Sequence, residues 1–129
     1  MSPAVRLASV RIFVDDVETA AAFYENVVGL ARTGTAPTAV LFGDSPSILV
    51  EAADDEARRE GLLGRFTGVA FETDDAAALY SDLKARGVPL HGPPETQPWG
   101  GVLLFAQDPS GNTISFVQYP AKSPDRRGS

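Results

Sequence analysis

The stretch VRIFVDD, residues 10–16, returns with the same pattern as VAFETDD at residues 69–75. In both places, alternating side chains predict a half-buried strand, and the two aspartates that follow can cap a helix. Each predicted helix then runs to a glycine, Gly29 in the first copy and Gly87 in the second. A repeat of this length predicts a duplicated module whose two copies pack together about a pseudo-twofold axis, with a cleft between them.

The repeat extends through the rest of each copy. Asp44 precedes Glu51 by seven residues, and Asp108 precedes Ser115 by seven, with the second residue of each pair in an apolar strand. The fold class predicted is therefore α+β, with two tandem βαβββ modules that form a curved mixed sheet around a cleft and carry their helices on the outer face.

The boundaries of the domain follow from composition. The modules occupy about residues 5–52 and 66–119. The charged segment 53–65, in which a helical turn is expected, joins them. Together they form one domain over residues 1–119. The polar tail, residues 120–129, is expected to be disordered.

Length, charge and cysteine content exclude several classes of function. A chain of 129 residues can build one proper core, and 43% hydrophobic with 22% charged residues is ordinary for a globular protein. The formal charge of −6 disfavours nucleic acid as a partner, since phosphate binding needs clustered Lys and Arg. The absence of cysteine excludes disulfides and thiolate sites. Without a signal peptide or a long apolar run, we expect a cytoplasmic protein that does not associate with membranes.

The phase of the strands predicts which side chains face the cleft. If Ile12 and Val14 pack beneath the first helix, and Val69 and Phe71 beneath the second, the alternate positions face away from the helices. A slip of one residue would move them all to the helix side. The positions expected to face the cleft are Ser9, Arg11, Phe13, Leu49, Glu51, Gly68, Ala70, Glu72, Thr113, Ser115 and Val117.

These two modules, with the caps and turns that bound their helices and strands, resemble the vicinal oxygen chelate superfamily. That superfamily includes glyoxalase I, extradiol dioxygenases and bleomycin-resistance proteins. The matching features cover nearly all of residues 7–119 and include Asp16, the pair Phe23-Tyr24 and the turn DPSGN at 108–112. The stretch QPWG at 97–100, together with that turn, is similar to the bleomycin-resistance branch. The resemblance to that branch implies an intertwined, head-to-tail homodimer with two ligand clefts.

The resemblance also identifies where a metal would bind. Metal enzymes of the superfamily hold their ion with four ligands, usually His and Glu, at equivalent strand positions. In this sequence those positions carry Ser9, Glu51, Gly68 and Ser115. Only Glu51 is a competent ligand, because Gly68 has no side chain and serine hydroxyls bind transition metals poorly. A catalytic ion needs about three protein ligands, so we expect neither a metal nor another cofactor.

Three single residues bear on which side chains could bind a ligand or take part in catalysis. Trp99, the only tryptophan, lies in a loop between Pro98 and Gly100, which favours an exposed place at the cleft rim where its ring could stack on a planar ligand. His91, the only histidine, lies in a loop rich in Pro and Gly and is expected to be solvated, so no Ser-His-Asp triad is predicted. Glu51 has three open interpretations: a structural partner of Arg11, a group that recognises a ligand amine, or a general base.

The leading hypothesis is a metal-free small-molecule-binding protein, with antibiotic sequestration of the bleomycin-resistance type as its specific form. The ligand is expected to be cationic or aromatic, and the protein to be a homodimer. The alternative is an enzyme of the superfamily, a lyase, isomerase or ring-cleaving enzyme with displaced metal ligands or with Glu51 as base. A third possibility is an accessory subunit with a vestigial cleft. No catalytic residue is assigned, and the predicted ligand-binding residues are Arg11, Phe13, Glu51, Glu72, Trp99 and Ser115.

Overall fold

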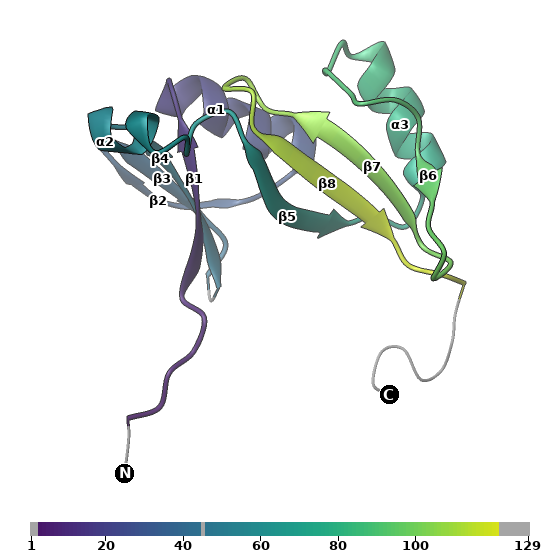
Figure 1. The fold of residues 1–129 in the computed structure, drawn as a ribbon, viewed down its shortest axis with the longest axis horizontal. Helices are drawn as coiled ribbons and strands as arrows, with labels where there is room; N and C mark the ends of the chain where they lie inside the picture. Colours follow the sequence, from purple (N-terminus) through teal and green to yellow (C-terminus); the bar gives the residue numbers. More distant parts are fainter. Residues whose placement is uncertain (1–2, 45, 122–129) are drawn as a thin grey trace. The chain divides into compact units, whose positions relative to one another are not determined.

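The computed structural model describes residues 3–44 and 46–121. The chain divides into two compact units. The first comprises the chain up to Arg65 together with the turn Asp108–Asn112, and the second comprises Phe66–Gln107 and the chain from Thr113 onward. Each unit contains one βαβββ module, so the protein is α+β, as the duplication predicts (Figure 1).

The first unit is built on a four-stranded mixed sheet with the strand order β1-β4-β3-β2. β1 (Ser9–Val14) runs parallel to β4 (Ser47–Ala52). β3 (Ala39–Phe42) pairs antiparallel with β4 on one side and with β2 (Arg32–Ala36) on the other. All four strands lie where the sequence predicts them, since its alternating and apolar stretches indicate strands over residues 7–14, about 30–36, 39–42 and 47–52.

The helix of the first unit packs on β3 and β4 of this sheet. Asp16 caps α1 (Val17–Phe23), and its carboxylate accepts hydrogen bonds from the amides of Glu18 and Thr19. A π-helical turn, Tyr24–Val28, carries the helix on to Gly29, where it ends as predicted. The π-turn itself was not predicted, because an apolar stripe does not distinguish an α-helical last turn from a π-helical one.

The second unit repeats this plan with the strand order β5-β8-β7-β6. β5 (Phe66–Glu72) runs parallel to β8 (Thr113–Gln118), and β7 (Val102–Gln107) pairs antiparallel with β8. α3 (Ala76–Ala85) packs on β7 and β8. The edge strand β6 (Glu95–Thr96) pairs with β7 and completes the second sheet. In the segment between the modules, α2 (Asp55–Arg59) is the helical turn expected there.

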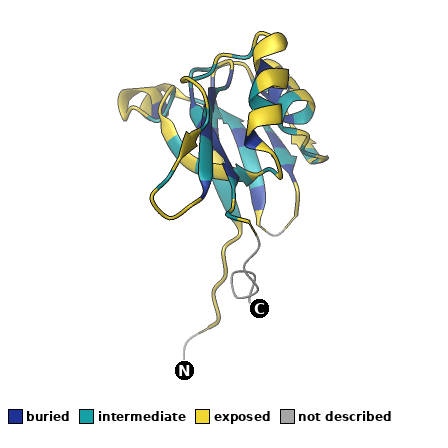
Figure 2. Ribbon diagram, turned by 90° about the vertical axis from the view of Figure 1, so that its right-hand side faces the viewer, coloured by how far each residue is buried: buried dark blue, intermediate teal, exposed yellow. Residues whose placement is uncertain are grey.

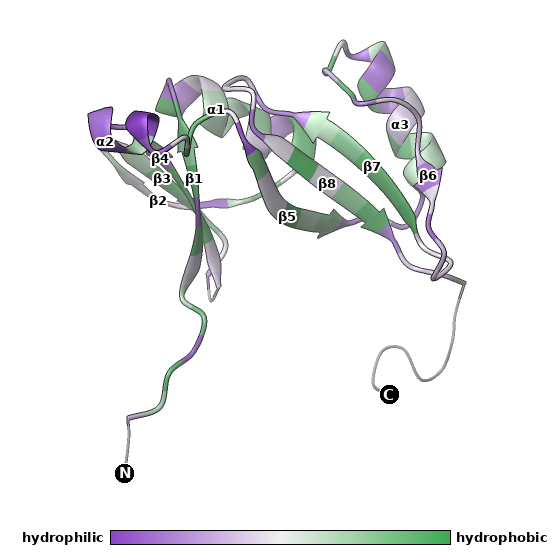
Figure 3. Cartoon of the chain, in the orientation of Figure 1, coloured by the Kyte–Doolittle hydropathy of each residue, from purple (hydrophilic) through white to green (hydrophobic). Residues whose placement is uncertain are grey.

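Each core lies between the helix and the sheet of its own unit. Ile12 and Val14 are buried, whereas Arg11 is exposed and Phe13 is half-buried, which confirms the predicted phase of β1. In the second unit Leu104 and Ala106 on β7 are buried together with residues of α3 and β8. Figure 2 shows buried stretches along the strands, and Figure 3 shows that β7 and β8 are hydrophobic whereas α2 is hydrophilic.

The turn Asp108–Asn112, between β7 and β8, holds a buried polar cluster of the first unit. The carboxylate of Asp108 accepts hydrogen bonds from the Tyr24 hydroxyl at 2.8 Å and from the Asn112 amide at 2.9 Å. The Asn112 side chain donates to the Phe13 carbonyl at 2.8 Å and accepts from the amide of Gly64, also at 2.8 Å. The turn therefore joins the π-helical turn after α1, the end of β1 and the segment before β5 to one another, and this explains why it belongs to the first unit.

Candidate functional site

Arg11, Phe13 and Glu51 come together on the face of the first sheet that α1 does not cover. The register pairs Phe13 with Glu51 on the neighbouring parallel strand. The Arg11 guanidinium makes a two-point contact with Glu51, Nε to Oε2 at 2.6 Å and Nη2 to Oε1 at 3.1 Å. The same guanidinium lies 5.3 Å from the centroid of the Phe13 ring. The structural pairing of Glu51 with Arg11 is thus confirmed.

This ion pair is only partly shielded from water. The Glu51 side chain is 19% exposed and that of Arg11 is 58% exposed. Hydrogen bonding to Glu51, and then the charge of Glu51, raise the pKa of Arg11 above its usual value. An ion pair this exposed contributes little to stability. Glu51 therefore presents a partly exposed carboxylate that is already oriented and still has unused lone pairs on both oxygens.

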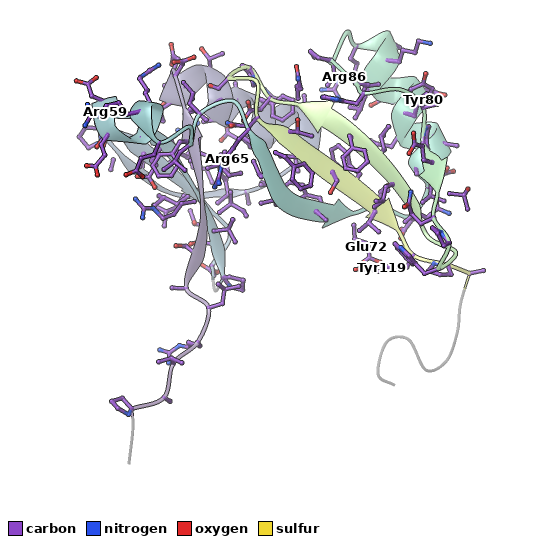
Figure 4. The ribbon with its side chains drawn as sticks, viewed as in Figure 1. Arg59, Arg65, Glu72, Tyr80, Arg86 and Tyr119 are labelled. Carbon is purple, nitrogen blue, oxygen red and sulfur yellow. The ribbon has the colours of Figure 1, made fainter. Side chains whose placement is uncertain are left out.

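On the second sheet the face opposite α3 carries another set of predicted residues. Ala70 pairs in register with Ser115, and Glu72 with Val117. Glu72 is exposed, and Figure 4 shows its side chain on β5. Ser115 is only 7% exposed, and its hydroxyl donates a hydrogen bond to the Val69 carbonyl at 3.1 Å. Ser115 is therefore on the predicted face, but its hydroxyl is engaged with the neighbouring strand.

Trp99 is exposed, as its loop position predicts. Its side chain is 53% exposed, and its ring lies 6.3 Å from the ring of Tyr119. On one side the indole covers Gly101 so closely that a Cβ built at Gly101 would overlap the ring carbons Cζ3 and Cη2. The indole is thus backed by main chain and by a second aromatic ring, and about half of its surface remains in contact with solvent.

The residues at the four family metal positions do not fit a metal ion. In the first unit Glu51 is held by Arg11. In the second unit Gly68 lies at a β-bulge with φ of +76°, a conformation that a side-chain-bearing residue would adopt only with strain, and Ser115 donates to Val69. Among residues 3–44 and 46–121, no three side chains of His, Asp or Glu gather so that they could hold an ion. In the same part of the chain no helix is long and apolar enough to span a bilayer.

The sequence interpretation missed two residues on these surfaces, Tyr119 and Phe66. Tyr119 packs beside Trp99, and its place directly after the last strand was the available signal. Phe66, at the start of β5, is 63% exposed and lies 6.3 Å from the ring of Phe105. Phe66 was missed because the sequence pattern predicts this strand over about Gly68–Thr73, whereas β5 begins two residues earlier. His91 is exposed in its loop, as expected.

Comparison with solved structures finds the same fold in many proteins. An antibiotic-binding protein, TnmS3 from Streptomyces sp. CB03234, is 26% identical, with 92% of this chain and 98% of that chain covered and a TM-score of 0.73. A glyoxalase/bleomycin resistance protein/dioxygenase superfamily member from Sphaerobacter thermophilus DSM 20745 is 29% identical, with 90% and 98% covered and a TM-score of 0.70. A lactoylglutathione lyase from Agrobacterium tumefaciens is 22% identical, with 90% and 95% covered and a TM-score of 0.70, which shows a shared fold alone.

At the level of sequence, no curated protein matches this chain. A family model does match, and it covers residues 6–116, which include every helix and all but the last two residues of the strands. The matched range spans both βαβββ modules seen in the structure. The chain therefore belongs to the Glyoxalase/Bleomycin resistance protein/Dioxygenase superfamily.

Proposed function

We propose that this protein is a metal-free binder of small molecules that carry a planar aromatic group and a positive charge. The observation that carries the proposal is the state of Trp99, a ring that is 53% exposed yet held against Gly101 and Tyr119. A large aromatic ring exposed to water forgoes burial that would stabilise it. Because the ring is held in place before a ligand arrives, stacking would cost little conformational entropy.

The second part of the proposal, a positive charge on the ligand, rests on the acidic residues of the protein. Glu51 is oriented by Arg11, Glu72 is exposed, and the chain has a formal charge of −6, so a cationic ligand would be attracted. TnmS3, the antibiotic-binding relative, supports antibiotic sequestration as the specific form of this function. In that form the protein would act by stoichiometric capture. In the first unit we assign ligand contacts to Phe13 and Glu51, with Arg11 holding the Glu51 carboxylate in place. In the second unit we assign them to Glu72 and Trp99, and we give Ser115 a structural role because its hydroxyl donates to the Val69 carbonyl.

Two substitutions with opposite expected effects test the role of charge. Glu51→Gln keeps the shape of the side chain and removes its charge. It should weaken the binding of a cationic ligand by about 1.5–3 kcal/mol, the range for a charge-assisted hydrogen bond. Arg11→Met removes the cation that competes for Glu51, so it should strengthen binding of the same ligand. Titration calorimetry with a bleomycin-type glycopeptide measures both.

A neutral analogue of the ligand is the control. Neither Glu51→Gln nor Arg11→Met should alter the binding free energy of this analogue by more than a few tenths of a kcal/mol. Added salt should weaken the binding of the cationic ligand only. If the neutral analogue binds as tightly as the cation to both variants and to the wild type, the carboxylates serve solubility and the charge part of the proposal fails.

The metal content separates this proposal from the enzyme alternative. One carboxylate with two serines and a glycine should not retain an ion through purification. We expect elemental analysis of protein purified without chelator to give well under one zinc, nickel, iron or manganese per chain. A stoichiometric metal whose removal abolishes a lyase, isomerase or ring-cleaving activity would favour the enzyme instead.

A further inference from the structure

A cavity lies on the helix-bearing side of the second unit, apart from the residues proposed above. It has a volume of about 250 Å³, and its lining residues are Tyr80, Lys84, Val88, Leu90 and Gly92. Tyr80 and Lys84 stand one turn apart on α3, and the other three belong to the segment that follows this helix. Figure 4 shows Tyr80 on α3.

Both walls of this cavity are fixed by main-chain hydrogen bonds. The Val88 amide donates to the Leu83 carbonyl at 3.0 Å, which closes the segment against the end of α3. Farther on, the His91 amide donates to the Phe105 carbonyl at 3.0 Å, and Leu90 forms a bridge with Ala106. A cavity whose walls are held in this way exists before any ligand binds, so little ordering is required on binding.

Lys84, which is exposed to solvent, supplies the positive charge of this cavity. Its ammonium lies 3.4 Å from the Tyr80 hydroxyl and 5.5 Å from the centroid of the Tyr80 ring. The side chain thus points back along α3 and away from the carbonyls at the end of the helix. Within the described residues no carboxylate pairs with Lys84, whereas its neighbour Arg86 pairs with Asp82 at 3.3 Å.

We propose that this cavity binds a small carboxylic acid with an apolar or aryl tail. The carboxylate would accept hydrogen bonds from the Lys84 ammonium and the Tyr80 hydroxyl, and the tail would lie against Val88 and Leu90. Drug-sized ligands occupy cavities of about 300–1,000 Å³, so a volume of about 250 Å³ suits a smaller molecule. No acidic side chain lines the cavity, so nothing in the lining repels an anion.

The proposal is tested by titrating the ¹⁵N-labelled chain of 129 residues with 3-phenylpropionate and with its uncharged amide. The acid should shift the amide signals of Tyr80, Val88, Leu90 and Gly92, and the amide should bind about tenfold more weakly or not at all. Lys84→Met should lower the affinity for the acid about tenfold, and Leu90→Ser, which removes apolar surface and leaves the charge, about fivefold.

Arg86→Gln is the matched control, because it removes one positive charge from the same helix without altering the lining. It should leave the affinity for the acid within about twofold, and each variant should keep the dispersed spectrum of the folded protein. Equal binding of acid and amide, an unchanged affinity in Lys84→Met, or shifts confined to residues outside the cavity would each overturn the proposal. Inorganic phosphate that binds as tightly as the acid would overturn the assignment to an amphipathic acid.

Discussion

At the scale of single residues, the position of Trp99 depends on the smallest residue near it. The indole covers the α-carbon of Gly101, so a methyl group there would occupy the same space as the ring. Gly101 has no positive φ, and alanine is therefore compatible with its backbone. Gly101→Ala should thus act on the tryptophan ring alone, while the main chain of the loop stays as it is.

We expect Gly101→Ala to displace the indole. The binding of an aromatic ligand should then weaken by about 1–3 kcal/mol, the range for the loss of one stacking partner. Trp99→Ala should have a similar effect. Because Trp99 is the only tryptophan, its fluorescence reports both the displaced ring and the binding of ligand. Gly34→Ala on β2 is the control, since its new methyl would make only ordinary contact with Leu41 at 3.5 Å. Unchanged affinity in a folded Gly101→Ala protein would give Trp99 a purely structural role.

What could be predicted at this scale followed from local rules. The exposure of Trp99 follows from its proline and glycine neighbours, and the pairing of Arg11 with Glu51 follows from strand alternation and opposite charge. The contact of Trp99 with Tyr119 joins residues that are twenty positions apart. Such a contact depends on how the loop before β7 and the end of β8 come together, and no local pattern encodes that.

At the scale of elements, every strand of four or more residues and the two longer helices could be located from periodicity and caps. The role of the turn Asp108–Asn112 could not be predicted from these local patterns. Its sequence predicts a turn, but its attachment through Tyr24 to the π-helical turn after α1 is a contact between residues 84 positions apart. Asp108 is 3% exposed, and a buried carboxylate is costly unless hydrogen bonds satisfy it. Tyr24 donates one of the bonds that do so.

Tyr24→Phe should therefore destabilise the protein. It removes the hydroxyl donor and leaves Asp108 with one fewer bond, so the free energy of unfolding near neutral pH should fall by about 1.5–3 kcal/mol. Urea denaturation measures the difference. Tyr80→Phe, on α3 in the second unit, is the control and should cost less than about 1 kcal/mol. If both variants unfold at the same urea concentration, the turn is not held by this bond.

The cost of Tyr24→Phe should also depend on pH. Burial, together with the charge of Asp108 and the hydrogen bond to it, raises the pKa of Tyr24 above the usual phenol value. The stabilisation that the protonated Tyr24 hydroxyl provides is therefore fully present below about pH 10, where the same side chain is still protonated in the unfolded chain. It is lost as the pH rises further. The wild type should therefore lose stability above about pH 10 faster than Tyr24→Phe, and the gap between them should narrow. A gap that widens with rising pH would contradict this assignment.

At the scale of the whole molecule, each sheet has a face that its own helix does not cover. On the second sheet that face includes Phe66, which is 63% exposed and stands beside Phe105 at the start of the edge strand β5. Exposed aromatic residues together with an open sheet edge favour association with another chain. We therefore expect a C2 homodimer that covers this face.

Sedimentation equilibrium at micromolar concentration should give twice the chain mass of 13.6 kDa for the wild type. Phe66→Glu should shift the protein towards the monomer, because association would then bury an unpaired carboxylate, and the far-ultraviolet circular dichroism should stay the same. Leu7→Glu is the matched control. Leu7 is also 63% exposed, but it lies before β1 and outside any sheet, so its substitution should leave the mass unchanged. A wild-type mass of 13.6 kDa, or equal masses for the two variants, would contradict association through the second sheet.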